Sequence, residues 1–131
     1  MIVSETRERF IHAIAGRLPT AEVVEAHFFG PRRRGEVESG VAVVAARVPQ
    51  EGVEPDPHRF TVFSATYLLT LKGADRGKWE AAVTPEADAP LVTVDEVVRV
   101  VARRAEEADE VTRMSGAEFR AIVESRLPAA P

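Results

Sequence analysis

The sequence predicts a single α+β domain over residues 1–131, built on a four-stranded antiparallel meander in the element order αββββαα. Three observations support this fold class. Four strand-like stretches follow one another between residues 22 and 83, separated by loops rich in glycine, proline and charge. One helical pattern precedes them. Two capping boxes, each a Ser or Thr followed three residues later by Glu, come after them.

The first helix is expected over residues 5–17, with Ser4 as its N-cap. Apolar residues, among them Phe10 and Ile14, recur at spacings of three and four and therefore share one face. Pro19 ends the helix, because the residue before a proline disfavours helical backbone angles.

The four strands are expected at residues 22–29, 41–48, 60–71 and 78–83. The second is apolar on both faces until Arg47, a pattern typical of an interior strand that is covered on both sides. We expect helices to cover one face and predict a homodimer whose interface uses either the other sheet face or the C-terminal helices. The expected aromatic anchors of the core are Phe10, Phe28 and Trp79.

The two capping boxes predict two C-terminal helices. Thr93 with Glu96 begins a helix that carries valines on one face up to Ala108, and Ser115 with Glu118 begins the last helix. A break or a bend near residue 112 is expected between them.

Composition excludes several classes of function. With no cysteine, the chain offers no disulfide, no thiolate nucleophile and no cysteine-ligated metal, and a cytoplasmic location is expected. The longest apolar run, residues 41–46, is too short to cross a membrane, and the first residues lack the pattern of a signal peptide. No glycine-rich nucleotide loop, nucleophile elbow or metal-ligand spacing is present, so neither a cofactor nor a metal ion is expected.

Basic residues are predicted to collect at one end of the meander. If each strand pairs with the next, the turns at residues 30–35 and 72–77 lie at the same end. That end would gather Arg32, Arg33, Arg34, Lys72, Arg76 and Lys78. Arginine forks suit oxyanions, so this basic tip could bind an acidic protein or an anionic ligand. The alternative is a pair of turns that are charged only for solubility. The acidic loop around Glu51, with Glu86 and Asp88, is expected at the opposite end.

A second candidate site lies on the first strand. Glu25 and His27 are two residues apart and share a strand face, so they could act as an acid–base pair, with Tyr67 as a further candidate. The alternative is a partly exposed histidine beside a salt-bridging glutamate. Metal binding would need a third ligand, and no suitable residue stands at a ligand spacing.

These observations lead us to expect a small non-catalytic binding or protein-interaction module with a basic hairpin tip. The alternative is a small enzyme or ligand-binding domain whose pocket, between the sheet and its helices, uses Glu25 and His27. The net charge of −4 and the lack of aromatic residues in the turns disfavour nucleic acid as a partner.

Overall fold

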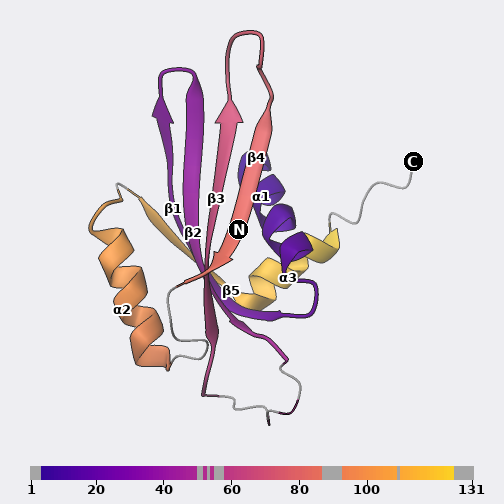
Figure 1. Ribbon diagram of the computed structural model, residues 1–131, viewed down its shortest axis with the longest axis vertical. Helices are drawn as coiled ribbons and strands as arrows, with labels where there is room; N and C mark the ends of the chain where they lie inside the picture. The colour runs from indigo at the N-terminus through magenta and orange to yellow at the C-terminus, as the bar shows by residue number, and fades with distance from the viewer. Residues whose placement is uncertain are drawn as a thin grey trace.

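The computed structural model describes residues 4–49, 52, 54, 58–86, 93–108 and 110–125. These residues form one antiparallel sheet with the strand order β4-β3-β2-β1-β5 and helices on both of its faces (Figure 1). The elements are α1 (Glu5–Arg17), β1 (Glu22–Arg34), β2 (Val37–Arg47), β3 (Thr61–Thr70), β4 (Trp79–Pro85), α2 (Val94–Ala105), β5 (Val111–Ser115) and α3 (Gly116–Ser125). The predicted α+β class and antiparallel sheet are confirmed.

The larger hydrophobic cluster lies between the sheet and the pair α1 and α3. The Phe10 ring meets Phe28 edge to face at a centroid distance of 6.0 Å, and both side chains are buried. Trp79 is half-buried against the same cluster and stacks on Tyr67 at 4.9 Å. Burying a phenylalanine contributes about 1.5–3 kcal/mol. The three predicted anchors therefore hold α1 on this face.

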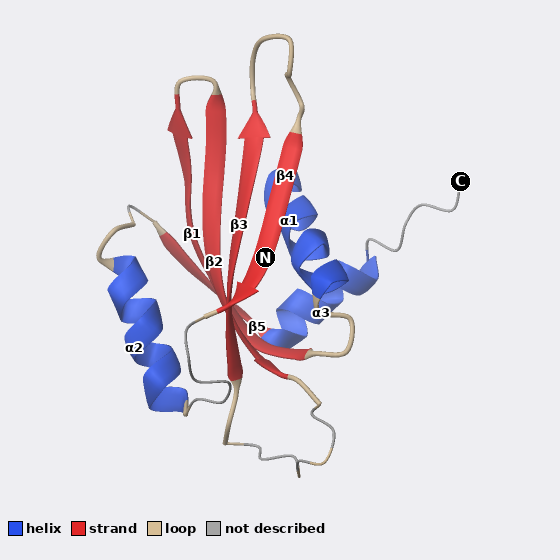
Figure 2. Ribbon diagram, in the orientation of Figure 1, coloured by secondary structure: helices blue, strands red, loops and turns tan. Residues whose placement is uncertain are grey.

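The other face of the sheet is covered by α2 (Figure 2). Neighbouring residues of β2 point to opposite faces, so Val44 packs under α1 while Val43 packs in the second cluster with Val97 of α2. Both valines of β2 are fully buried. Both faces of β2 are therefore covered by helices of the same chain, so the burial of β2 does not require a second subunit.

The expected four strands are corrected to five. Residues 111–115 form β5, which pairs antiparallel with β1 from Phe29↔Val111 to Glu25↔Ser115. Val111 and Thr112 are β-branched and therefore favour a strand, and the alternation of side chains along β5 buries Met114 completely. The order is therefore αββββαβα. The Ser115 capping box is present as a reciprocal pair of hydrogen bonds with Glu118.

The Thr93 box opens α2 at the expected place but does not cap it. Thr93 makes no side-chain cap bond, and its hydroxyl donates to Glu96 at 3.5 Å instead. The backbone N–H of Val97 still bonds the Thr93 carbonyl.

The turn expected at residues 30–35 is also corrected, because β1 continues to Arg34. The pairing shifts register between Phe29 and Arg32, so Gly30 and Pro31 form an irregularity inside the strand. Proline has no N–H for the ladder, and Gly30 adopts φ +93° and donates its N–H to the Glu110 carbonyl. The hairpin turn itself is only Gly35-Glu36.

Gly40 in β2 is required by the packing of Tyr67. The two residues are paired across β2 and β3, and a Cβ at Gly40 would overlap Cε1 of the Tyr67 ring. The ring therefore occupies the space that a side chain would fill on this face. Tyr67 in turn contacts Phe10 edge to face at 4.8 Å, so this glycine determines how α1 packs.

We expect Gly40→Ala to lower the free energy of unfolding by about 1–3 kcal/mol, because the ring or the strand must shift. Gly16→Ala is the matched control. Gly16 lies near the end of α1 with no atom near the position of an added Cβ, so alanine should raise stability by about 0.5–1 kcal/mol. Urea denaturation measures both changes. Equal stability of Gly40→Ala and the wild type would contradict the close packing.

Candidate functional site

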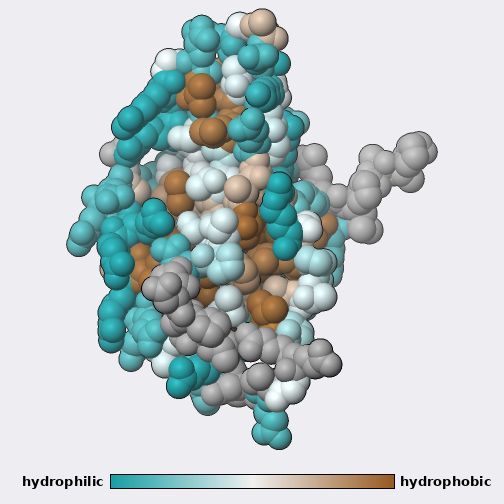
Figure 3. Space-filling model, viewed as in Figure 1, coloured by the Kyte–Doolittle hydropathy of each residue, from teal (hydrophilic) through white to brown (hydrophobic). Residues whose placement is uncertain are grey.

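The two hairpin turns lie at the same end of the sheet, as predicted from the meander (Figure 1). The backbone joins them, since the N–H of Leu71 donates to the Glu36 carbonyl at 2.7 Å. We call this region the hairpin end and define it as residues 32–38 and 70–80. In the space-filling view the top of the molecule, where the two turns lie, is mostly hydrophilic (Figure 3).

The three arginines of the hairpin end have different surroundings. Because they lie on a strand and not in a turn, successive side chains project to opposite faces. Arg32 donates to the Glu107 carbonyl after α2 at 2.9 Å, and Arg33 donates to Glu38 on the other face at 3.0 Å. Arg34 is exposed and makes no ion pair with a described residue. Two of the three predicted anion-binding arginines thus have intramolecular partners.

The basic residues of the second turn are more open to solvent. Lys72 and Arg76 are exposed and form no ion pair within the described part of the chain. Lys78 pairs with Glu80 at 3.5 Å, but both side chains are about 60% exposed. Such a surface pair contributes little to stability. Among the described residues, the basic side chains of the hairpin end that form neither an ion pair nor a side-chain hydrogen bond are therefore Arg34, Lys72 and Arg76.

Glu38 is a buried carboxylate that the sequence interpretation missed. Its residue is 4% exposed, and its two oxygens accept hydrogen bonds from Arg33 Nε and from the Tyr67 hydroxyl, both at 3.0 Å. A buried charge is costly unless it is paired and hydrogen-bonded, and Glu38 has both kinds of partner. Extending the alternation of β2 back from Ala42 by steps of two would have placed position 38 on the buried face.

Tyr67 remains a neutral phenol in this network. Burial, the charge of Glu38 and the hydrogen bond to that carboxylate raise the pKa of Tyr67 well above its ordinary value of 10.0. The hydroxyl therefore donates a hydrogen bond and does not serve as an acid near neutral pH.

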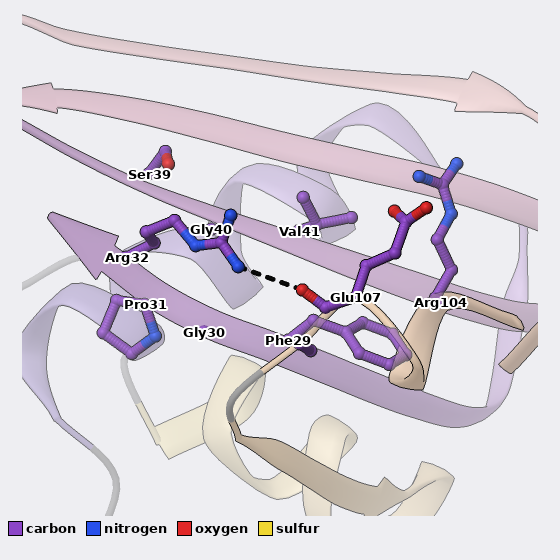
Figure 4. A pocket seen from close by; sticks show the side chains of 10 residues that line it. Phe29, Gly30, Pro31, Arg32, Ser39, Gly40, Val41, Arg104 and Glu107 are labelled. Carbon is purple, nitrogen blue, oxygen red and sulfur yellow. Dashed lines mark hydrogen bonds between the residues drawn. The ribbon is translucent and has the colours of Figure 1, made fainter. Parts of the chain in front are cut away.

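Two pockets lie on opposite faces of the sheet at the level of Gly30 and Gly40. The first, which we call the α1 pocket, has a volume of about 170 Å³ and is lined by the start of α1, the Tyr67 ring and Glu38. The second, the α2 pocket, measures about 180 Å³. In Figure 4 the Arg32 side chain crosses the α2 pocket to the Glu107 carbonyl. Its second cation, Arg104, pairs with Glu86 at 3.5 Å.

Of the three acidic residues named for the predicted acidic end, only Glu86 is described, and its carboxylate forms an ion pair with Arg104 of α2. Glu51 and Asp88 lie outside the described residues.

Glu25 and His27 come together, but Tyr67 does not join them. His27 Nε2 donates to Glu25 Oε2 at 3.1 Å, and Arg113 Nε of β5 donates to the same oxygen at 2.9 Å. Ser64 shares this sheet face but is separated from His27 by Val43 of β2. Tyr67 belongs to the cluster on the opposite face. Neither Glu25 nor His27 lines the two pockets described above.

The Glu25 carboxylate is held in its charged form. Partial burial alone would raise its pKa, but the hydrogen bonds and charges of Arg113 and His27 outweigh burial and lower the pKa below 4.5. Glu25 thus acts as an acceptor that links β1 to β5, which is the salt-bridging alternative considered from the sequence.

Among the described residues, no three His, Asp or Glu side chains gather closely enough to bind a metal ion. Within the same residues, none of the helices is both long and apolar enough to span a bilayer. Comparison of the chain with family models, curated proteins and solved structures found no match. The function is therefore inferred from geometry and charge alone.

The Tyr67 network predicts an alkaline dependence of stability. Because the native pKa of Tyr67 is raised, its contribution to the free energy of unfolding is complete below about pH 10 and is lost as the pH rises through the native pKa. Tyr67 is the only tyrosine, so ultraviolet phenolate absorbance reports on it directly. Phenolate should appear at higher pH in the native protein than in urea-unfolded chains. Identical titration curves in the two states would contradict the buried network.

A second prediction concerns Glu25. Since the native pKa of Glu25 is lowered, its contribution to the free energy of unfolding is present above its ordinary pKa of 4.5 and is lost as the pH falls through the native pKa. Arg113→Gln removes one hydrogen bond and should raise the pKa of Glu25, as followed by carboxyl carbon NMR. Arg120→Gln on the exposed surface of α3 is the control and should leave it unchanged.

Proposed function

We propose that this protein is a binding module without catalysis of its own, and that its hairpin end docks on an acidic protein surface. The observation that supports this function is the set Arg34, Lys72 and Arg76, whose side chains are exposed without an ion-pair partner among the described residues. They stand on two turns that are hydrogen-bonded to each other through Leu71 and Glu36. A fixed spacing of cations lowers the ordering cost of binding a matching set of carboxylates.

The distribution of charge supports the same proposal. The chain has a net charge of −4, yet its hairpin end holds six basic residues against the carboxylates of Glu36, Glu38, Asp75 and Glu80. Both lysines of the chain lie beside the second turn. A positive end on an otherwise acidic molecule orients it toward an acidic partner during encounter.

Protein is favoured over nucleic acid as the partner. The segments 32–38 and 70–78 contain no aromatic residue on which a base could stack. The adjacent Trp79 ring stacks on Tyr67, and the Arg9 guanidinium lies 4.3 Å from the Trp79 centroid, so this ring already has partners in place of a base.

The alternative, a small enzyme or ligand-binding domain, is supported by the α1 pocket more than by Glu25 and His27. Those two side chains are bonded to each other and to Arg113 and lie away from that pocket. If Glu25 and His27 were catalytic, His27→Gln would abolish turnover of the ligand in an activity assay.

Oligomeric state and location belong to this proposal as well. The homodimer stays a prediction. The outer edge of β4, one of the two end strands of the described sheet, is where a second copy could add a strand. A monomeric mass in light scattering would contradict it. A cytoplasmic location is supported by the absence of cysteine.

The docking proposal predicts a selective effect of charge at the hairpin end. The triple variant R34Q/K72Q/R76Q should bind a labelled polyglutamate peptide about tenfold more weakly than the wild type at low salt, since each lost ion pair contributes up to about 1 kcal/mol. The control R17Q/R99Q/R120Q carries the same net charge on exposed helix positions and should bind like the wild type. Fluorescence anisotropy measures both.

Two outcomes would contradict docking at the hairpin end. Equal weakening by the two triple variants would mean that only net charge matters. Tighter binding of a single-stranded oligonucleotide than of the peptide, with strong salt dependence, would replace protein with nucleic acid as the partner.

A further inference from the structure

We propose that the α1 pocket binds a small organic monoanion, a 2-hydroxy carboxylate, between the guanidinium groups of Arg7 and Arg33. This site shares Arg33 and Glu38 with the hairpin end, but the proposal goes beyond the docking function. It involves Arg7, which lies outside the hairpin end, so the two proposals can fail separately.

The size of the pocket limits the ligand. The α1 pocket has a volume of about 170 Å³. Pockets for drug-sized ligands start at about 300 Å³. The α1 pocket therefore suits a molecule of a few non-hydrogen atoms. Gly30 and Gly40 both line the pocket, and the Tyr67 ring fills the space beside Gly40, so the volume open to a ligand is small.

The charge in the pocket calls for an anion. Arg7 is part-buried and uses one side-chain N–H, to the Gly30 carbonyl at 3.3 Å, and Arg33 uses Nε for Glu38. A guanidinium has five donors, so both retain unused N–H groups. Two cations face one buried carboxylate, which leaves an excess of one positive charge. Arg7, Arg33, Glu38 and Tyr67 all line the same pocket.

The excess of one charge also selects among anions. A monoanion balances it, whereas a phosphate dianion would be repelled by Glu38 and a zwitterionic amino acid would leave it uncompensated. Glu38 accepts one hydrogen bond at each carboxylate oxygen, and such an oxygen can accept two. A ligand hydroxyl next to the ligand carboxylate would fill one of these positions.

Part of the remaining wall of the pocket is aromatic, beside Ser4, Thr6, Pro31 and Val41. Phe10, Phe28 and Tyr67 line it, with Phe10 in edge-to-face contact with both of the other rings. The Arg7 guanidinium lies 5.0 Å from the Phe28 centroid, which fixes its orientation. A short apolar substituent on the ligand would therefore meet carbon, while the carboxylate meets the two cations. Lactate has this combination in its smallest form.

The experiment is a titration of the full chain with lactate, followed by amide NMR. We expect saturable shifts at Arg7, Arg33 and Tyr67 with a dissociation constant of about 1–10 mM, in keeping with the small size of the ligand. Alanine and phosphate should bind at least about tenfold more weakly, since each mismatches the pocket by one charge. Arg7→Gln should weaken lactate binding about tenfold or more. Arg17→Gln, at the exposed end of the same helix, should not change it.

A second variant guards against misfolding. Arg7→Lys keeps the charge over Phe28 but removes the fork, and it should weaken lactate binding while leaving the NMR spectrum dispersed. Equal binding of lactate, chloride and phosphate, unchanged affinity in both Arg7 variants, or shifts confined to the hairpin end would each overturn the proposal. Peptide binding by the R34Q/K72Q/R76Q variant reports on docking alone, because none of those residues lines the α1 pocket.

Discussion

The double burial of β2 is the constraint on which the rest of the fold depends. Val43 and Val44 are neighbours in sequence and both are fully buried, so two separate layers must cover the sheet. The chain meets this need by crossing from one sheet edge to the other. It leaves the sheet at β4, covers the second face with α2, and returns at the opposite edge as β5. That return lets α3 join α1 on the first face.

Beside Phe10 of α1, the first face of the sheet is filled by Tyr67. The Tyr67 ring lies over Gly40, and its hydroxyl donates a hydrogen bond to Glu38, which precedes Gly40 by two residues in β2. Stability alone does not require a carboxylate here, since an apolar side chain of similar volume is often neutral or stabilising at a buried ion-pair site. The carboxylate instead fixes the Tyr67 hydroxyl and draws Arg33 toward the α1 pocket. Its value is therefore best sought in binding.

Sequence periodicity predicted the helices, the meander and the common end of the two turns because each depends on patterns of a few residues. It could not predict β5, because a five-residue strand next to a capping box gives too short an alternation to separate from a helix. It also placed a turn at Gly30-Pro31, where tertiary pairing carries the strand onward. Glu38 was missed because the second strand was expected to begin only at residue 41, whereas β2 begins at Val37. Its partner Tyr67 lies twenty-nine residues away in sequence, so local patterns could not reveal the hydrogen bond between them.

Arg33 connects the two surfaces on which binding is proposed. Its side chain is 72% exposed at the hairpin end, yet its Nε bonds Glu38 inside the α1 pocket. A carboxylate bound in that pocket would hold the Arg33 fork inward and lower the positive potential at the hairpin end. Arg33 is not one of the three cations assigned to the docked partner, so the anion would act on docking only through this change of potential. If both proposed ligands bind, linkage then requires that each weakens the other by the same factor.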